Sequence, residues 1–374
     1  MAGARQAACI VGEEMDLNRI FMKNATPTKI GGQAIMEGIM MRGEDRTATI
    51  VRLPDASLHL KTEKLKAPGR AAKLPLIRGC VSFFASLVMG TRILMYSADV
   101  LESFEYPEGE GPEEDKVTKW MNTHFGEKAA WNIMIYSSVV VAMLFTVGVF
   151  ILLPTFLMNL AGNYIENPVV LNLIEGLVRM LLFIGYIWAI RHMEEIREVF
   201  RYHGAEHKTI HCYENKLELT PENADSFYTL HPRCGTSFLM FVMVLTIFIY
   251  ALLGWPSLFW RIVSRILLLP VIAGFSYELL RWAGSSDSAV VKGISLPGIC
   301  LQKLTTCEPS AKHLEVAIAA MKACNVSPET PEYEGPCDLA GNPCTHEESI
   351  ASAMTGAMGK AMGNEKTAPV AESL

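Results

Sequence analysis

The stretch TSFLMFVMVLTIFIYALLGWPSLFW (residues 236–260) decides the class of this protein, because it contains no charged residue. A second uncharged stretch covers residues 131–153. A helix needs about 20 consecutive apolar residues to cross the hydrocarbon core of a bilayer. Both stretches are long enough, so the sequence predicts membrane-spanning helices and excludes a purely soluble protein.

Two further apolar runs bring the predicted number of spans to four. The run from Val169 to Arg191 is apolar between its ends apart from Glu175 and Arg179, which are four positions apart and can neutralise each other on one helix face. Residues 262–282 contain few charged side chains and follow a short turn at residues 254–257, which predicts a helical hairpin.

Residues 76–101 form a fifth apolar segment of a different kind. Its uncharged core between Arg78 and Arg92 has only 13 residues, a length typical of interfacial or re-entrant helices. The positive-inside rule supports this interpretation, because four spans place every basic segment on the cytoplasmic side. The sequence therefore predicts a multi-pass protein of the cytoplasmic membrane with both termini in the cytoplasm.

The polar segments carry weaker local signals. Alternating residues at 49–53 and 57–61 flank Pro54-Asp55-Ala56 and predict a β-hairpin. The segment GGQAIMEGIMMRG (residues 31–43) has four glycines, which indicate tight backbone geometry but fit no phosphate-loop spacing. After Glu308-Pro309-Ser310, one face of a predicted helix carries apolar side chains at Leu314, Ala317, Ile318 and Met321.

The expected fold class is mainly α, a polytopic membrane protein with about four transmembrane helices, an interfacial or re-entrant helix and a small cytoplasmic β-containing N-terminal segment. In chain order we expect a flexible N-terminus, a β-hairpin segment, the interfacial or re-entrant helix, an acidic cytoplasmic linker, the membrane domain, a cytoplasmic C-terminal segment and a disordered tail. Their residues are 1–27, 28–75, 76–101, 102–130, 131–282, 283–326 and 327–374.

Charge and cysteine content exclude other classes. The net charge is -6 without a strongly basic tract, so no nucleic-acid partner is expected. Nine cysteines without regular spacing do not suggest a disulfide framework and favour a reducing compartment. The first thirty residues lack the apolar core of a cleavable signal peptide, so the internal helices are expected to drive insertion.

The segment YHGAEHKTIHCYE (residues 202–214), within the histidine-rich loop at 191–235, carries the candidate chemistry. His203, His207 and His211 are spaced by four, so on a helix they share one face. The pattern H-x-x-E-H is found in zinc enzymes whose two histidines bind the metal while the glutamate, here Glu206, acts as general base. We therefore expect a divalent metal, with zinc as the preferred ion.

A catalytic zinc site usually has three protein ligands and one open position. The candidates for the third ligand are His211, His231 or Cys234 in the segment HPRCGT, and Glu278 in the last span. The alternative is an interfacial cluster of polar histidines without any metal.

Four segments in order resemble the YqhQ-like family of bacterial multi-pass membrane proteins. They are GGQAIMEGIMMRG (31–43), YHGAEHK (202–208), HPRCGTSF (231–238) and PGICLQKLTT (297–306) followed by Glu308-Pro309. The resemblance covers about residues 28–322. It implies a bacterial inner-membrane setting and a metal-dependent enzyme, although the family has no assigned reaction.

Two functions follow as hypotheses. The first is a zinc-dependent hydrolase that acts near the cytoplasmic membrane surface. The second is a non-enzymatic membrane factor that binds a protein partner in membrane-protein insertion or assembly, or a transport component, with at most a structural metal. In both, the lipid bilayer is a partner.

Overall fold

The computed structural model describes part of the chain, in two compact units. The described residues are 20–21, 28–65, 74, 77–105, 116–161, 164–165, 167–254, 257–284, 286 and 288–356. The first unit comprises Met1–Leu101, Ala189–Phe241 and Ala273–Leu374, and the second comprises Glu102–Trp188 and Val242–Ile272.

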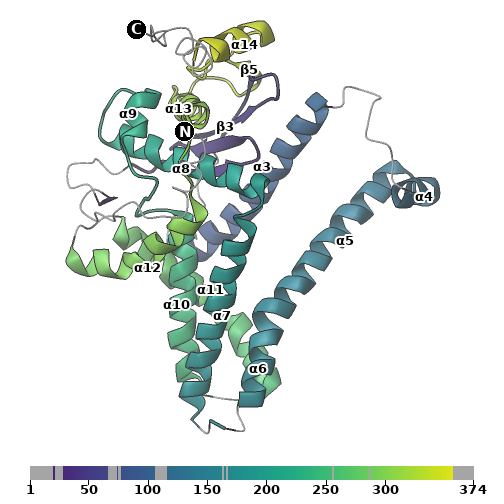
Figure 1. The fold of residues 1–374 in the computed structure, drawn as a ribbon, viewed down its shortest axis with the longest axis vertical. Coiled ribbons are helices and arrows are strands. Elements are labelled where there is room, and N and C mark those ends of the chain that lie inside the picture. The colour runs from purple at the N-terminus through teal and green to yellow at the C-terminus, as the bar shows by residue number, and fades with distance from the viewer. Residues whose placement is uncertain are drawn as a thin grey trace, which may run out of the picture. The chain divides into compact units, whose positions relative to one another are not determined.

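An antiparallel five-stranded sheet organises the first unit (Figure 1). Each strand is paired with the next one along the chain, in the order β1 (Gly31–Ile35), β2 (Gly38–Arg42), β3 (Arg46–Arg52), β4 (Leu58–Lys64) and β5 (Tyr333–Cys337). The buried apolar residues of β2, β3 and β4 lie in register, with Ile39 opposite Ile50 and Ile50 opposite Leu60.

The predicted β-hairpin is confirmed as β3 and β4. The side chain of Asp55 stabilises its turn by accepting hydrogen bonds from the backbone N–H of Ser57 at 3.0 Å and from its hydroxyl at 2.6 Å. Ala56 completes the turn with a φ of 71°.

The tight backbone expected in residues 31–43 is also present. Glu37, in the turn between β1 and β2, has a φ of 47°. The next residue, Gly38, lies so close to β3 that a Cβ atom there would be 2.2 Å from the carbonyl oxygen of Ile50. A side chain at this position would push the central strands apart.

Helices α8 (Glu194–Glu214) and α13 (Ala311–Cys324) pack against the sheet and bury its apolar side chains (Figure 1). The predicted face of α13 is confirmed, because its four apolar side chains are buried in this core. Ser310 begins the helix with a capping box in which the ring of His313 accepts from the backbone N–H of Ser310 at 3.0 Å.

The expectation of a disordered tail over residues 327–374 is wrong for residues 333–355. Tyr333–Cys337 forms β5, and His346–Thr355 forms helix α14 with a Thr345–Glu348 capping box. The strand's sequence, YEGPC, has no strong β pattern of its own. It becomes ordered because the edge of β4 offers unpaired backbone groups, with Leu58 opposite Cys337.

Among the described residues, five helices are long and apolar enough to cross a membrane. They are α3 (Ile77–Glu105), the continuous α5 (Glu127–Val147), η2 (Gly148–Leu152) and α6 (Leu153–Ala161), then α7 (Pro168–Ile190), α10 (Gly235–Leu252) and α11 (Leu258–Ala283). The remaining helices are shorter: α4 (Lys116–Phe125), within the expected linker, α9 (Pro221–Asp225) and α12 (Ala289–Thr305). Both helices of the predicted α10–α11 hairpin are present, and the Tyr250 hydroxyl donates to the carbonyl of Arg265 at 3.0 Å, while residues 255–256 of the turn lie outside the described part of the chain. Helix α3 is one candidate more than the four predicted spans.

Within the first unit, α3 contacts both apolar and polar neighbours. Near its start, a Cβ atom on Gly79 would lie 2.9 Å from the Cα of Gly274, so α3 and α11 are in close backbone contact. Towards its other end, Arg92 pairs with Glu63 of β4 at 2.8 Å, and the Nζ atom of Lys61 lies 4.3 Å from the ring centre of Tyr96. The second half of α3 therefore lies beside the sheet.

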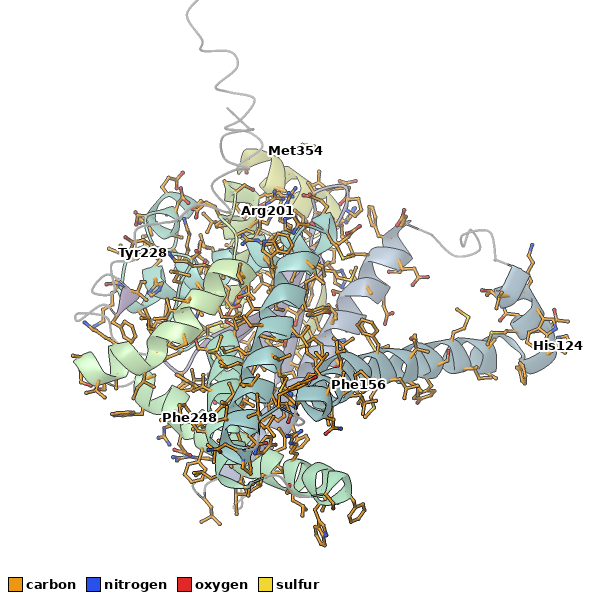
Figure 2. The ribbon with its side chains drawn as sticks, turned by 60° about the horizontal axis from the view of Figure 1, so that its bottom comes forward. His124, Phe156, Arg201, Tyr228, Phe248 and Met354 are labelled. Carbon is orange, nitrogen blue, oxygen red and sulfur yellow. The ribbon has the colours of Figure 1, made fainter. Side chains whose placement is uncertain are left out.

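The second unit is built from the apolar helices around an internal ion cluster. Large apolar side chains such as Phe156 and Phe248, labelled in Figure 2, are exposed by 60% and 62%. The predicted pair of Glu175 and Arg179 is confirmed at 2.9 Å, and Arg265 of α11 also binds Glu175, at 2.6 Å.

Replacing Ser349 tests whether α14 and β5 pack against β4. Its hydroxyl accepts from the backbone N–H of Leu58 at 2.8 Å and donates to the carbonyl of Cys337 at 2.6 Å, which links α14 to β4 and β5. Ser349→Ala leaves a buried donor unsatisfied, so we expect a loss of about 1–3 kcal/mol in the free energy of unfolding, measured by thermal denaturation in detergent. Thr355→Ala, on an exposed position of α14, is the control and should be neutral; equal stability of both variants would contradict the ordered tail.

Candidate metal centre

Helix α8 carries the H-x-x-E-H motif through the interior of the first unit. Most residues of its second half are buried, including Tyr202 and the sequence from Gly204 to Cys212. At Gly204, a Cβ atom would lie 2.2 Å from the carbonyl oxygen of Cys307, so the absence of a side chain lets the chain after α12 approach the helix. The backbone N–H of Cys307 donates to the carbonyl of Phe200 at 2.9 Å, which holds this contact.

Backbone carbonyls orient both histidine rings of the motif. The Nδ1 atom of His203 lies 2.8 Å from the carbonyl oxygen of Thr305, and that of His207 lies 2.5 Å from the carbonyl oxygen of Thr229. Since a carbonyl only accepts hydrogen bonds, Nδ1 must be the protonated nitrogen in each ring. In a neutral ring held in this way the lone pair is on Nε2, the arrangement found in metal-binding histidines.

Cys234 provides the third ligand atom. Its Sγ lies 3.2 Å from Nε2 of His203, and the ligand atoms of Cys234, His203 and His207 all lie within 4.8 Å of one another. Burial alone would raise the pKa of the Cys234 thiol, but the neighbouring His207 and hydrogen bonds from Thr236 lower it. Burial lowers the pKa of His207 to about 4, so this ring is neutral at physiological pH.

These three groups fit a tetrahedral metal. Zinc–nitrogen bonds of about 2.0–2.1 Å and zinc–sulfur bonds of about 2.3 Å place nitrogen and sulfur ligands about 3.5 Å apart in tetrahedral geometry. The 3.2 Å between Nε2 of His203 and Sγ of Cys234 is close to that spacing. Zinc needs neutral imidazole rings and a thiolate, so its binding would displace the proton of the Cys234 thiol, which lies within hydrogen-bonding reach of His203.

Glu206 lies beside this group and is almost completely buried. Burial raises the pKa of its carboxyl group to about 7. Nearby His203 and a hydrogen bond from the backbone N–H of Gly32 lower this pKa, whereas nearby Cys234 raises it further. A carboxyl group with this pKa can exchange a proton near neutral pH. The first strand of the sheet therefore positions the motif's glutamate.

The other two histidines extend the cluster without joining the three ligand groups. Nε2 of His211 lies 2.9 Å from the carbonyl oxygen of Leu230, and the ring centres of His211 and His231 are 4.7 Å apart. Nδ1 of His231 accepts from the backbone N–H of Arg233 at 3.3 Å. Burial lowers the pKa of His231 to about 3, so it too is neutral.

Glu278 does not reach the cluster. Its carboxylate accepts from Nε of Arg78 at 2.6 Å, which ties α11 to α3. Of the third-ligand candidates identified in the sequence, the structure brings Cys234 into the group, holds His211 and His231 beside it and places Glu278 in a separate ion pair.

Two buried residues that the sequence does not mark as candidates, Gln302 and Glu214, position the segments around the site. Gln302 of α12 is fully buried, and its amide accepts from the backbone N–H of His231 and donates to its carbonyl, both at 2.8 Å. Buried Glu214 accepts from the backbone N–H of Thr28 at 2.8 Å and pairs with Arg233. Gln302 lies in the PGICLQKLTT segment, and its place in that family motif is the one sequence feature that could have identified it. For Glu214, no sequence feature beyond its position on the same helix as the histidines indicates a role.

Comparison with known proteins shows the family to which this chain belongs. The model described as "Protein of unknown function (DUF1385)" matches residues 74–326. This chain belongs to that family. It is also 34% identical over 304 residues to the uncharacterized protein YqhQ of Bacillus subtilis (strain 168), covering 79% of this chain and 92% of the relative. No solved structure matches the chain. The resemblance to a YqhQ-like family is thereby confirmed, and the family's function is uncharacterised.

Adjacent glycines at the start of β1 test the contact with Glu206. A Cβ atom on Gly32 would lie 2.8 Å from Cδ of Glu206 and 2.9 Å from the carbonyl oxygen of Met40, whereas one on Gly31 would contact nothing within 4 Å. We expect Gly32→Ala to lower the free energy of unfolding by about 1–3 kcal/mol, because backbone must move, and Gly31→Ala to have little effect. Thermal denaturation of both variants measures the difference, and equal midpoints would contradict the close approach of Gly32 to Glu206 and Met40.

Proposed function

We propose that this protein is a membrane-embedded, metal-dependent hydrolase with a zinc site on its cytoplasmic side. The observation that carries the proposal is that three potential metal ligands and a potential general base lie together in one buried group. His203 and His207 hold Nδ1 on backbone carbonyls and bring their ligand atoms within 4.8 Å of the Cys234 sulfur, and Glu206 lies next to them with a pKa of about 7. Three protein ligands leave a fourth coordination position open, as in catalytic zinc sites.

Each residue then has a distinct role. His203, His207 and Cys234 hold the metal. The chemistry that zinc supplies in such a site is activation of water near neutral pH and polarisation of a carbonyl group. The Glu206 carboxylate takes the proton from water and returns it to the leaving group, while the N–H of Gly32 fixes its orientation.

The connectivity of the first unit supports a four-span topology. Strands β1–β4 precede the apolar helices, α8 lies between two pairs of them, and α13 and β5 follow them. These elements form one core with a shared sheet, so they must occupy the same side of a membrane. The chain must then cross the membrane an even number of times between β4 and α8. Two membrane-spanning helices in this part of the chain meet that requirement, and three do not.

We therefore propose that α5 to α6, α7, α10 and α11 cross the membrane and that α3 lies at its cytoplasmic surface. The contacts of Arg92 and Tyr96 of α3 with β4 support an interfacial position. Together with the basic residues of the segments that form the sheet and α8, this supports a cytoplasmic position for the candidate metal centre and for both ends of the chain.

Burial of the site favours one alternative function. His207 and Cys234 are almost inaccessible to solvent, as expected of a metal that stabilises a fold rather than reacting. In that case the protein is a non-enzymatic membrane factor, and the cytoplasmic unit binds a protein partner. The two proposals share the metal and differ in whether Glu206 is needed for activity.

Metal content of the purified protein tests the shared part. We expect about one zinc per chain by elemental mass spectrometry, and loss of that zinc in the His203→Ala/His207→Ala double variant, because two of three ligands are removed. His211→Ala is the matched control from the same helix face and should keep its zinc, since His211 binds the Leu230 carbonyl. Absence of stoichiometric metal from the wild-type protein would exclude the site.

The variant Glu206→Gln distinguishes the proposed enzyme from the proposed non-enzymatic factor. If the site is catalytic, this isosteric change should lower hydrolysis by about 10²–10⁴-fold while zinc content stays the same, because only the proton-accepting group is lost. Suitable probes are a nitrophenyl ester and fluorescently labelled casein, presented to the zinc-loaded protein in detergent. Hydrolysis that is absent from the wild type, or equal in Glu206→Gln, would favour the non-enzymatic factor.

A further inference from the structure

The second unit contains a cavity of about 510 Å³ with charged groups in its wall. Its lining comes from η2, α6, α7, α10, α11 and the end of α5, and consists mostly of apolar side chains such as Phe150, Met180 and Ile247. The volume is within the range of small-molecule sites, about 300–1,000 Å³. The charged residues of the wall are Glu175, Arg179 and Arg265.

These three residues leave an uncompensated positive charge. Arg265 binds both oxygens of Glu175, at 2.6 and 2.8 Å, and so neutralises it in a bidentate pair. Arg179 also reaches Glu175, through Nη2 at 2.9 Å, so two guanidinium groups share one carboxylate. The net charge of the cluster is therefore +1.

The second guanidinium group is held so that part of it remains available. Nε of Arg179 donates to the carbonyl of Phe150 at 2.9 Å, where the helical backbone is a π-helix, and Nη2 donates to Glu175. Within the described part of the chain, Nη1 of Arg179 makes no hydrogen bond. Arg265, by contrast, uses both terminal nitrogens on Glu175 and lies 5.2 Å from the ring centre of Tyr250.

A net charge in this position needs a counter-charge. Glu175 is seven residues from the start of α7, so the cluster lies about 10 Å along the helix, inside the apolar span. Ionisable groups at such depth are costly unless paired, and they commonly mark a ligand site. An anion bound at Nη1 of Arg179 would complete the pairing, and the apolar wall would accept a hydrocarbon chain attached to it.

We propose that this cavity binds an anionic amphiphile, with its acidic group on Arg179 and its acyl chain along the apolar wall. The site is separate from the candidate metal centre, so either can fail without the other. The shared ligand chemistry is an acidic headgroup on an acyl chain, which can come from a free fatty acid or from an anionic phospholipid.

Binding of radiolabelled palmitate to the full chain in neutral detergent tests the proposal. We expect saturable binding of about one palmitate per chain, and competition by uncharged hexadecanol that is at least about tenfold weaker, because the charge-assisted hydrogen bond is lost. Competition by phosphatidylglycerol, but not by phosphatidylcholine, would identify an anionic phospholipid as the source. No competition by phosphatidylglycerol would identify the free acid.

Variants locate the binding to this cavity. Arg179→Gln should weaken palmitate binding by at least about tenfold, whereas Arg281→Gln, an exposed arginine at the other end of α11, should leave it unchanged. Thr246→Phe keeps all three charges but fills the cavity, and should abolish binding. It also serves as the second test if Arg179→Gln does not fold.

Four results would overturn the proposal. Equal competition by hexadecanol would show that the site is merely apolar, and equal competition by inorganic phosphate would show that the acyl chain contributes nothing. Absence of saturable binding, or binding unchanged in both Arg179→Gln and Thr246→Phe, would exclude an amphiphile from this cavity.

Discussion

Two hydrogen bonds from histidine rings to backbone carbonyls are the interactions on which the candidate site depends. They connect α8 to the segment before α10, through His207 and Thr229, and to the end of α12, through His203 and Thr305. Each bond also selects the ring tautomer, because a carbonyl cannot donate. The same contacts thus set the packing of both rings and the tautomer of the neutral form, in which Nε2 carries the lone pair near Cys234.

The same rule, that a buried polar group needs a partner, explains the surroundings of the site. The Gln302 amide satisfies both backbone groups of His231, and buried Lys208 donates to the carbonyl and carboxylate of Asp225, each at 3.0 Å. These contacts join α8, α9 and α12 around the cluster. In the second unit Arg179 is the contrasting case, because a charged side chain in an apolar wall is only partly paired there.

The sheet also restricts how the chain can enter a membrane. Its strands come from both ends of the chain, while α8, which packs against β1, comes from between the apolar helices. Pairing β4 with β5 requires both ends to be on one side, and packing α8 against the same sheet requires the middle to be there as well. An antiparallel sheet cannot satisfy its backbone hydrogen bonds across a bilayer, so this core supports an even number of crossings between its parts.

The sequence by itself determined what depends on local pattern. Apolar length identified the candidate membrane helices, alternation identified the β3–β4 hairpin, and helical spacing placed His203 and His207 on one face. Only the tertiary structure decided which distant residues meet: Cys234 rather than Glu278 beside the histidines, Gly32 against Glu206, and β5 on the edge of β4. These contacts join positions from 31 to more than 270 residues apart. They depend on backbone close approach and on which buried group lacks a partner, and neither property leaves a periodic signal in the sequence.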